Sequence, residues 1–189
     1  MATPSARQVE LLEAAYQYVL EHGLVDLSLR PLAAAIGSSP RVLLFLFGTK
    51  EGLVRALLAR ARAEELALID QVDSHRSEAP AGLAAGAELI WSWLRAPHHR
   101  RLLQLWAEAY TRSVVDHDGA WAGFASTTVD DWLAFLARCE PETDRQDADG
   151  PARRTLALAV LRGCLLDLLA TGDEDRVDAA VAHYLGSLT

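Results

Sequence analysis

The stretch over residues 28–55 constrains the fold more than any other part of the chain. Ser28 is suited to cap a helix, and the apolar residues that follow it recur at helical spacing. Gly37 can adopt the left-handed conformation that ends a helix. Ser39, followed by a proline, is suited to begin the next one. The stretch therefore predicts a helix, a tight turn and a second, short helix over residues 40–47.

Gly48 is expected to end the second helix, and Thr49 to cap a longer one that runs to residue 73. Two short helices joined by a glycine-containing turn form the helix-turn-helix of DNA-binding proteins. An earlier amphipathic stretch over residues 5–22 completes a three-helix unit. The apolar residues expected in its core are Leu12, Ala15, Leu32, Ile36, Leu43, Phe47 and Leu53.

At these residues the chain resembles the N-terminal domain of the TetR (tetracycline-repressor-like) family, over residues 7–60. The segment SPRVLLFLFGTKEGL is similar to the actinobacterial-type branch of that family. Many fixed spacings over a short stretch make this more specific than a lone motif. The residues that carry the pattern are Ser28, Leu32, Ala33, Gly37, Ser39, Leu43, Phe47, Thr49, Lys50, Glu51 and Leu53.

The resemblance implies an all-α protein of about nine helices. It implies a helix-turn-helix DNA-binding domain over residues 1–48 and a ligand-binding and dimerisation domain over residues 49–189. The helix over residues 49–73 would connect them. The partners implied are a double-stranded DNA operator, a small-molecule effector and a second copy of the chain. The residues implied to face DNA are Ser28, Arg30, Ser39, Pro40, Arg41, Val42, Leu44, Leu46, Thr49 and Lys50.

The short helix over residues 40–47 departs from its relatives, which often carry Thr, Tyr or His where this chain has apolar residues. Arg41 remains as the base reader, since a guanidinium can contact guanine O6 and N7 together. Val42 or Leu44 can touch thymine methyl groups, and Lys50 is suited to a phosphate. An exposed apolar row has a second interpretation, as a contact patch for another protein or for the chain's own effector domain.

The net charge of −8 is unevenly distributed. Residues 1–60 carry six basic and five acidic side chains, so residues 61–189 carry a net charge of −9. An acidic body would repel DNA everywhere except at the helix-turn-helix and so favour one docking orientation. The alternative is that this is the ordinary charge of a soluble acidic protein.

A polar break over residues 73–82 precedes five further helical stretches, and no stretch alternates as a strand would. They are expected at 81–95, 97–115, 120–139, 151–171 and 173–187. No apolar run approaches the roughly 20 residues that span a bilayer, and the N-terminus lacks a signal peptide's apolar region. We therefore expect a soluble cytoplasmic protein without a membrane partner. Its two cysteines form no CxxC motif, which fits a reducing compartment.

All five tryptophans lie between residues 91 and 132. Aromatic walls with a few polar groups are typical of an apolar small-molecule pocket, although the same rings can simply fill a helical core. Asp167, with apolar neighbours on both sides, must be paired, hydrated or at a pocket wall. The residues predicted to line the pocket are Trp91, Trp106, Tyr110, Trp121, Phe124, Thr128, Trp132, Cys164 and Asp167.

The last two helices also resemble the same branch, whose counterparts pack against a second subunit as a four-helix bundle. Apolar residues cover more than one face of the helix at 151–171, more than a single core contact can bury. Ala159 and Gly163 permit close helix approach. The residues predicted at the dimer interface are Leu158, Leu161, Leu165, Val177, Val181 and Tyr184.

No catalytic or metal-binding constellation is found in the sequence. His98 and His99 lack a metal-ligand spacing, and no phosphate-binding loop or GxSxG elbow is present. We expect no enzyme activity, no cofactor and no metal. The hypothesis is a dimeric repressor that binds a pseudo-palindromic operator and is released by a small, largely apolar molecule. The alternative is a small-molecule or protein-binding module whose helix-turn-helix no longer reads DNA.

Overall fold

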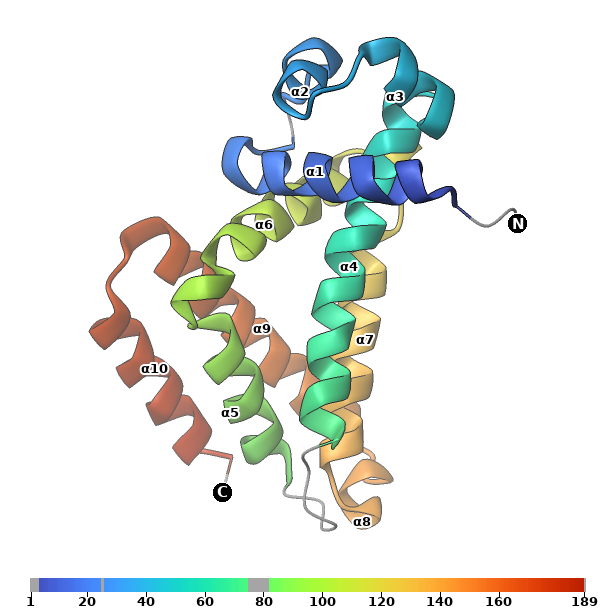
Figure 1. Ribbon diagram of the computed structural model, residues 1–189. Helices are drawn as coiled ribbons and strands as arrows, with labels where there is room; N and C mark the ends of the chain where they lie inside the picture. Colours follow the sequence, from blue (N-terminus) through green and yellow to red (C-terminus); the bar gives the residue numbers. More distant parts are fainter. Residues whose placement is uncertain (1–3, 25, 75–81, 189) are drawn as a thin grey trace. The chain divides into compact units, whose positions relative to one another are not determined.

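The computed structural model describes residues 4–24, 26–74 and 82–188, without the side chains of residues 68–74. Within these ranges the chain forms ten α-helices, two 3₁₀ turns and no strand (Figure 1). The predicted all-α fold is confirmed, with one helix more than expected. The helices are α1 (Ala6–His22), α2 (Leu29–Ala35), α3 (Pro40–Phe47), α4 (Lys50–Ser74), α5 (Gly82–Leu94), α6 (Arg100–Val115), α7 (Phe124–Cys139), α8 (Glu142–Arg145), α9 (Gly150–Thr171) and α10 (Glu174–Gly186).

Most predicted helix boundaries are confirmed to within a few residues, and α3 agrees at both ends. The extra helix is α8, within a polar run expected to be a break. Its four residues are too few to show a period. The stretches predicted at 97–115 and 120–139 each begin with a 3₁₀ turn, at Pro97–His99 and Gly119–Trp121. The predicted break at 73–82 lies mostly outside the described residues.

The chain divides into two compact units. The first comprises Met1–Ala67 and Arg101–Ala125, and the second comprises Leu68–Arg100 and Ser126–Thr189. The division predicted between residues 48 and 49 does not coincide with this one, because most of α4 and nearly all of α6 pack with the helix-turn-helix. Within the described ranges no single helix is both long and apolar enough to cross a membrane; the bent pair α2 and α3 passes that test only when taken together.

The first unit buries one face of α1 against α2, α3 and α4. Leu11, Ala15 and Val19 follow one another at intervals of four residues and are almost fully buried. Of the predicted core, Ala15, Leu32, Leu43 and Leu53 are confirmed as buried. Leu12, Ile36 and Phe47 are only half-buried. On α1 the inward face runs through Leu11 rather than Leu12, and Ile36 and Phe47 lie at the ends of α2 and α3.

An arginine of α4 holds α1 in place within the first unit. The Arg60 guanidinium donates to Glu13 at 2.8 Å and to Glu64 at 2.9 Å, and it lies 4.5 Å from the ring centroid of the buried Tyr16. The hydrogen bond from Arg60 lowers the pKa of Glu13, and burial raises the pKa of the Tyr16 phenol. This cluster fixes how α1 crosses α4.

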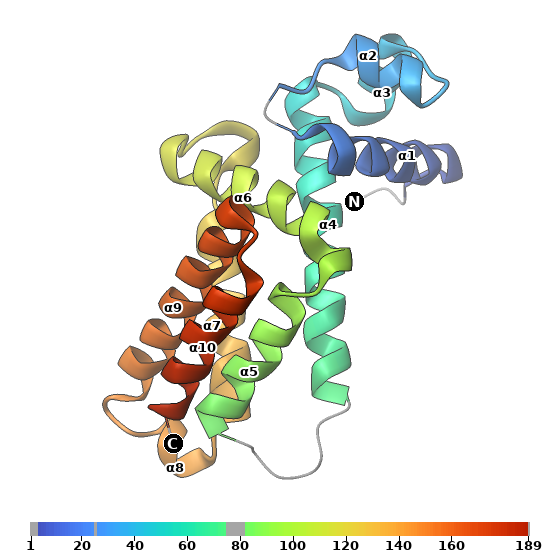
Figure 2. The same ribbon diagram turned by 90° about the vertical axis from the view of Figure 1, so that its left-hand side faces the viewer.

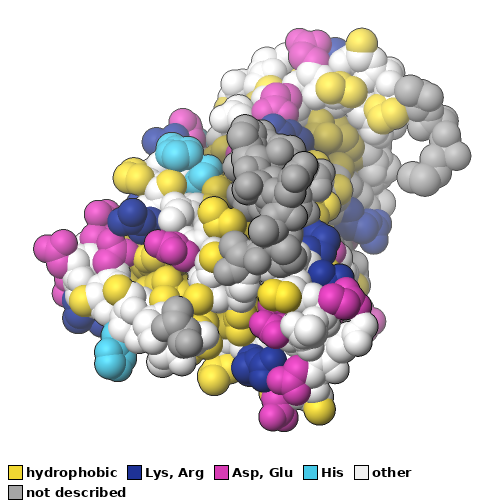
Figure 3. Space-filling view, turned by 90° about the horizontal axis from the view of Figure 1, so that it is seen from below, with side chains coloured by type: hydrophobic (Ala, Val, Ile, Leu, Met, Phe, Trp, Pro, Cys, Tyr) yellow, Lys and Arg dark blue, Asp and Glu magenta, His cyan; other side chains and the backbone are white. Residues whose placement is uncertain are grey.

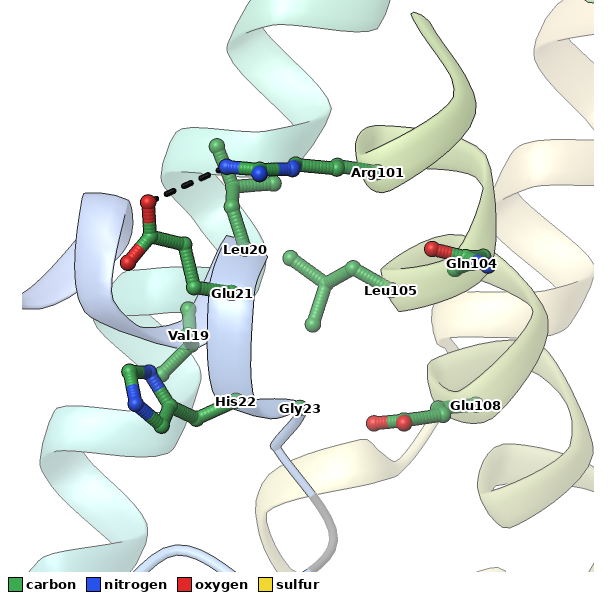
Figure 4. Close-up of a pocket in the computed structure, with 9 residues that line it drawn as sticks. All are labelled: Val19, Leu20, Glu21, His22, Gly23, Arg101, Gln104, Leu105 and Glu108. Atoms are coloured by element: carbon green, nitrogen blue, oxygen red, sulfur yellow. Dashed lines mark hydrogen bonds and ion pairs between the residues drawn. The ribbon is translucent and has the colours of Figure 1, made fainter.

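A second contact joins α6 to the end of α1. Glu108 accepts a hydrogen bond from the amide of Leu24 at 2.8 Å, and Arg101 pairs with Glu21 at 3.0 Å. Between these contacts lies a cavity of about 340 Å³, into which Leu105 points (Figure 4). The segment that leads from α1 to α2 is therefore held by a carboxylate of α6.

In the second unit, α5, α9 and α10 run side by side (Figures 1 and 2). The indole of Trp91 on α5 donates to Asp178 of α10 at 2.7 Å, and Arg95 pairs with the same carboxylate at 3.0 Å. Gly86 of α5 lies against Cys139 of α7; a Cβ at residue 86 would stand 2.8 Å from the Cβ of Cys139. A glycine there lets α5 and α7 approach closely.

A buried ion pair joins the end of α7 to the start of α9. The side chain of Arg154 donates to Glu140, and the two residues are 9% and 1% exposed. Arg145 also donates to the carbonyl oxygen of Glu140 at 3.1 Å. The Glu140–Arg154 pair is a buried polar contact that fixes α7 against α9.

On the surface seen in Figure 3, acidic and basic side chains lie close together at several places, with hydrophobic side chains exposed between them.

Candidate DNA-binding surface and effector site

The helices α2 and α3, with the turn between them, form a helix-turn-helix. The two helix axes differ by 102°, within the usual range for this motif. After α2, Gly37 adopts a φ of 62°, and the Ser39 hydroxyl caps α3 by accepting from the amide of Val42 at 3.3 Å. The predicted caps at Ser39 and Gly48 are confirmed. Ser28 precedes α2 as predicted, but its side chain makes no capping hydrogen bond.

The outward face of α3 carries one cation and three apolar side chains. Arg41 is exposed, and Val42, Leu44 and Phe45 are 38%, 40% and 85% exposed. The opposite side of α3 is anchored by Leu43, which is fully buried. Positions 41 and 45 are one helical turn apart, so these two side chains lie on the same face. This face is available to a partner.

Two positions of α3 bear on the predicted set of DNA-facing residues. Leu46 is half-buried, and its backbone carbonyl accepts a hydrogen bond from the side chain of Gln8 of α1 at 3.2 Å. Its contact with DNA remains a prediction. Phe45, which was left out of that set, is the most exposed large apolar residue described. Its spacing of four from Arg41 was the signal that could have found it.

The remaining predicted DNA contacts are compatible with the structure. Arg30 and Arg41 are exposed and make no ion pair within the described part of the chain, and Lys50 is exposed at the start of α4. The Thr49 hydroxyl accepts from the amide of Gly52 at 3.0 Å and so caps α4. Ser28 and Ser39 are exposed, and Pro40 is half-buried. Their contacts with DNA remain predictions.

The predicted effector pocket draws its residues from both units. In the first unit, the rings of Trp106 and Tyr110 lie 4.9 Å apart, and Trp121 and Phe124 are half-buried. In the second, the predicted residues are Trp91, Thr128, Trp132, Cys164 and Asp167. Their joint role in one pocket remains a prediction.

Three members of the pocket set in the second unit have other partners or lie elsewhere. The indole nitrogen of Trp91 donates a hydrogen bond to Asp178, as described above. Asp167 is exposed and pairs with Arg176 at 3.0 Å. This ion pair and the exposure explain how a carboxylate is tolerated between apolar neighbours in the sequence. Cys164 lies on the same side of α9; burial and the charge of Asp167 raise the pKa of its thiol. The role of Trp91, Cys164 and Asp167 as pocket walls remains a prediction.

Trp93, which is not in the predicted pocket set, lies close to Trp132. Its ring lies 5.8 Å from that of Trp132, which in turn meets Phe135 edge-on at 6.0 Å. The indole nitrogen of Trp93 and the hydroxyl of Thr128 are both buried and have no hydrogen-bond partner among the described residues. Buried polar groups are normally paired, so these two are candidate handles for a ligand.

Replacement of Thr128 by valine is expected to stabilise the ligand-free protein by about 1–2 kcal/mol. The residue is 2% exposed, and an isosteric methyl group removes the desolvation penalty of an unpaired hydroxyl. The midpoint of thermal unfolding measures the change. A Thr127→Val variant, at an exposed position next to it, is the control and should change little. A Thr128→Val protein less stable than the parent would show that the hydroxyl is paired.

The predicted dimer-interface residues lie mostly inside the subunit. Five of the six, all except the half-buried Tyr184, are 0–3% exposed and form the contact of α9 with α5 and α10. They are Leu158, Leu161, Leu165, Val177 and Val181. Side chains already removed from water cannot bury further area against a second subunit. That assignment is therefore wrong for these five residues.

A second stripe of apolar and small residues stands exposed on the opposite face of α9. Leu156 and Leu166 are 56% and 52% exposed, and small residues lie between and beyond them. The stripe, spaced by three and four residues in turn, consists of Leu156, Ala159, Gly163, Leu166 and Ala170. This repeat is the one that allows two helices to pack along their length.

The described residues were compared with the usual arrangements of metal ligands and paired cysteines. Among the described residues there is no group of three or more His, Cys, Asp or Glu side chains placed to hold a metal ion. Cys139 is buried and Cys164 half-buried, and both are free thiols.

Comparison with known proteins relates the chain to solved structures only. No protein-family model matches it, and no curated protein sequence does. A transcriptional regulator from Rhodococcus sp. Rha1 matches with a TM-score of 0.77 and 19% identity, covering 96% of this chain and 95% of that one. A TetR transcription regulator from Haloarcula marismortui matches with a TM-score of 0.75 and 16% identity, covering 96% and 97%. The multidrug binding protein EbrR, solved with imidazole, matches with a TM-score of 0.65 and 24% identity, covering 94% and 88%. The chain has the fold of the TetR-family transcriptional regulators.

Proposed function

We propose that the protein is a ligand-responsive transcriptional regulator of the TetR family, a repressor that binds a pseudo-palindromic operator as a homodimer. The observation that carries the proposal is the exposed outer face of α3 in a properly capped helix-turn-helix. Such a helix is suited to enter the major groove, and a two-fold dimer presents two of them to successive turns of DNA.

The effector is proposed to be a small, largely apolar molecule with a hydrogen-bonding group. The aromatic cluster of Trp93, Trp132 and Phe135 offers apolar walls, and the unpaired Thr128 hydroxyl and Trp93 indole offer polar contacts. EbrR, which shares the fold, was solved with imidazole and with proflavin. This neighbour supports the same class of ligand for the present chain.

Release from the operator requires the effector to prefer a conformation whose two α3 helices are wrongly spaced. The helix α4 is continuous from Lys50, next to α3, to Ser74, so a tilt of α4 would move α3. A coupling of about 1–3 kcal/mol lowers operator affinity by roughly 5- to 150-fold.

The homodimer is proposed to form through the exposed stripe of α9. The stripe is apolar and lies on a 22-residue helix, and the glycine at its centre permits close approach of a second helix. The buried face of the same helix is already used by α5 and α10. The two faces together account for the excess of leucine that the sequence shows in α9.

Replacement of Arg41 by alanine is expected to weaken operator binding by about 1–3 kcal/mol without unfolding the protein, because a bidentate contact to guanine is lost.

Replacement of Lys50 by alanine should weaken binding to all DNA sequences alike and reduce the slope of log K against log salt concentration by about one, because a phosphate contact is lost. A gel-shift titration of the region upstream of the protein's own gene, across salt concentrations, measures both effects.

Arg112→Ala on α6 is the matched control for these two variants. Arg112 is an exposed arginine outside the helix-turn-helix, in a long ion pair of 3.8 Å with Asp116, and its loss should leave affinity unchanged. Equal affinity of the Arg41→Ala and parent proteins at fixed salt would remove the base-reading role. Absence of any specific DNA complex would favour the alternative function, a binding module whose helix-turn-helix no longer reads DNA.

A further inference from the structure

The outer face of α3 offers very few hydrogen-bonding groups. Of the four exposed side chains on it, only Arg41 can donate, and Val42, Leu44 and Phe45 are apolar. The hydroxyls of Ser39 and Thr49 already accept hydrogen bonds from the first turns of their own helices. A protein that reads bases by hydrogen bonds needs more donors and acceptors than this face provides.

The same face is unusually apolar for an exposed surface. Phe45 is 85% exposed, and Val42 and Leu44 flank the row that it forms with Arg41. Large apolar side chains gathered on a surface indicate an interaction site. Leu43 of the same helix is fully buried, so the exposed side chains lie on the outer side of α3.

Exposed cations on the helix-turn-helix and at the start of α4 favour a polyanionic partner. Arg30 and Arg41 are exposed without an ion pair in the described ranges, and Lys50 and Arg55 follow on α4. A polyanion with apolar groups in its groove complements both features. In the major groove of DNA the apolar group is the C5 methyl of thymine, which no other DNA base presents.

We propose, on the basis of the proposed function, that Phe45 determines operator specificity by packing against thymine methyl groups, with Val42 and Leu44 on either side. The half-site then holds a guanine contacted by Arg41, flanked by thymines. Recognition rests on the shape and apolarity of the groove floor rather than on a series of hydrogen bonds.

Thymine methyl groups can be removed without changing any hydrogen bond, by replacing thymidine with deoxyuridine. The probe is a duplex recovered from a random-sequence double-stranded DNA library by selection on the full-length protein, then synthesised in both forms. Removal of one contacted methyl group is expected to weaken binding about fourfold. Removal of several contacted methyl groups should weaken it by a larger factor. Fluorescence anisotropy at fixed salt measures the dissociation constants.

A double-mutant cycle identifies Phe45 as the residue that contacts the methyl groups. Phe45→Ala is expected to bind the thymine duplex about tenfold more weakly than the parent does. For this variant, exchange of the thymine duplex for the deoxyuridine duplex should lower the affinity little further. Because Phe45 is exposed, its removal takes no side chain from the core, and the variant is expected to fold as the parent does; circular dichroism checks this. Arg41→Ala, the matched variant one turn away, should retain the full sensitivity to deoxyuridine.

The outcomes separate this proposal from the proposed function. If the selected duplex binds equally in its thymine and deoxyuridine forms, or if Phe45→Ala retains the full sensitivity to deoxyuridine, the role of Phe45 is overturned while the regulator function stands. If selection recovers no duplex above non-specific binding, the proposed function itself fails.

Discussion

Replacement of Glu140 by alanine is expected to lower the free energy of unfolding by about 3–5 kcal/mol. The carboxylate is almost fully buried at the end of α7 and accepts a hydrogen bond from Arg154 at the start of α9. Its removal leaves a guanidinium buried without a counter-charge, and this cost exceeds the net worth of the pair itself. The loss is a large share of the stability of an ordinary domain.

Urea denaturation followed by circular dichroism, at one fixed protein concentration, measures this loss. Glu142→Ala is the matched control, since Glu142 lies two residues away and forms an exposed ion pair with Arg145 at 3.4 Å; its removal should cost less than about 1 kcal/mol. Replacing both Glu140 and Arg154 by apolar residues of similar size should recover most of the stability. A Glu140→Ala protein as stable as the control variant would contradict the burial of this pair.

Replacement of Gly163 by leucine is expected to weaken the dimer by roughly 30-fold or more. In the single subunit a Cβ at residue 163 meets no heavy atom within 4 Å, so the side chain fits and helix propensity improves. At a close contact between two copies of α9, overpacking costs about 1–3 kcal/mol at each site. Two-fold symmetry applies the cost twice.

Sedimentation analysis of the variant and the parent measures the dimer dissociation constant. Ala134→Leu, which adds a leucine at an exposed position of α7, is the control and should leave the constant unchanged. A Gly163→Leu protein that dimerises with the parent's affinity would place the interface elsewhere. A monomeric parent would contradict the proposed dimer as a whole.

The sequence by itself determined most of the helices of this protein and, for α3, both ends. Ser39, Pro40 and Gly48 place both ends of α3, because capping and chain reversal depend on atoms within three or four residues of each other. The helix-turn-helix is built from such local interactions, so its existence, its bounds and the exposed Arg41 on it could be predicted without any tertiary contact.

The tertiary structure decided which side of each apolar helix faces inward. The residues of α9 are apolar on more than one face, and only the packing of α5 and α10 shows that Leu161 is inside and Leu166 outside. The same applies on α5, where Trp91 is buried and Trp93 half-buried, and on α3, where Leu46 is half-buried and Phe45 exposed. Local sequence cannot rank two apolar faces of one helix, because burial is set by neighbours that arrive from elsewhere in the chain.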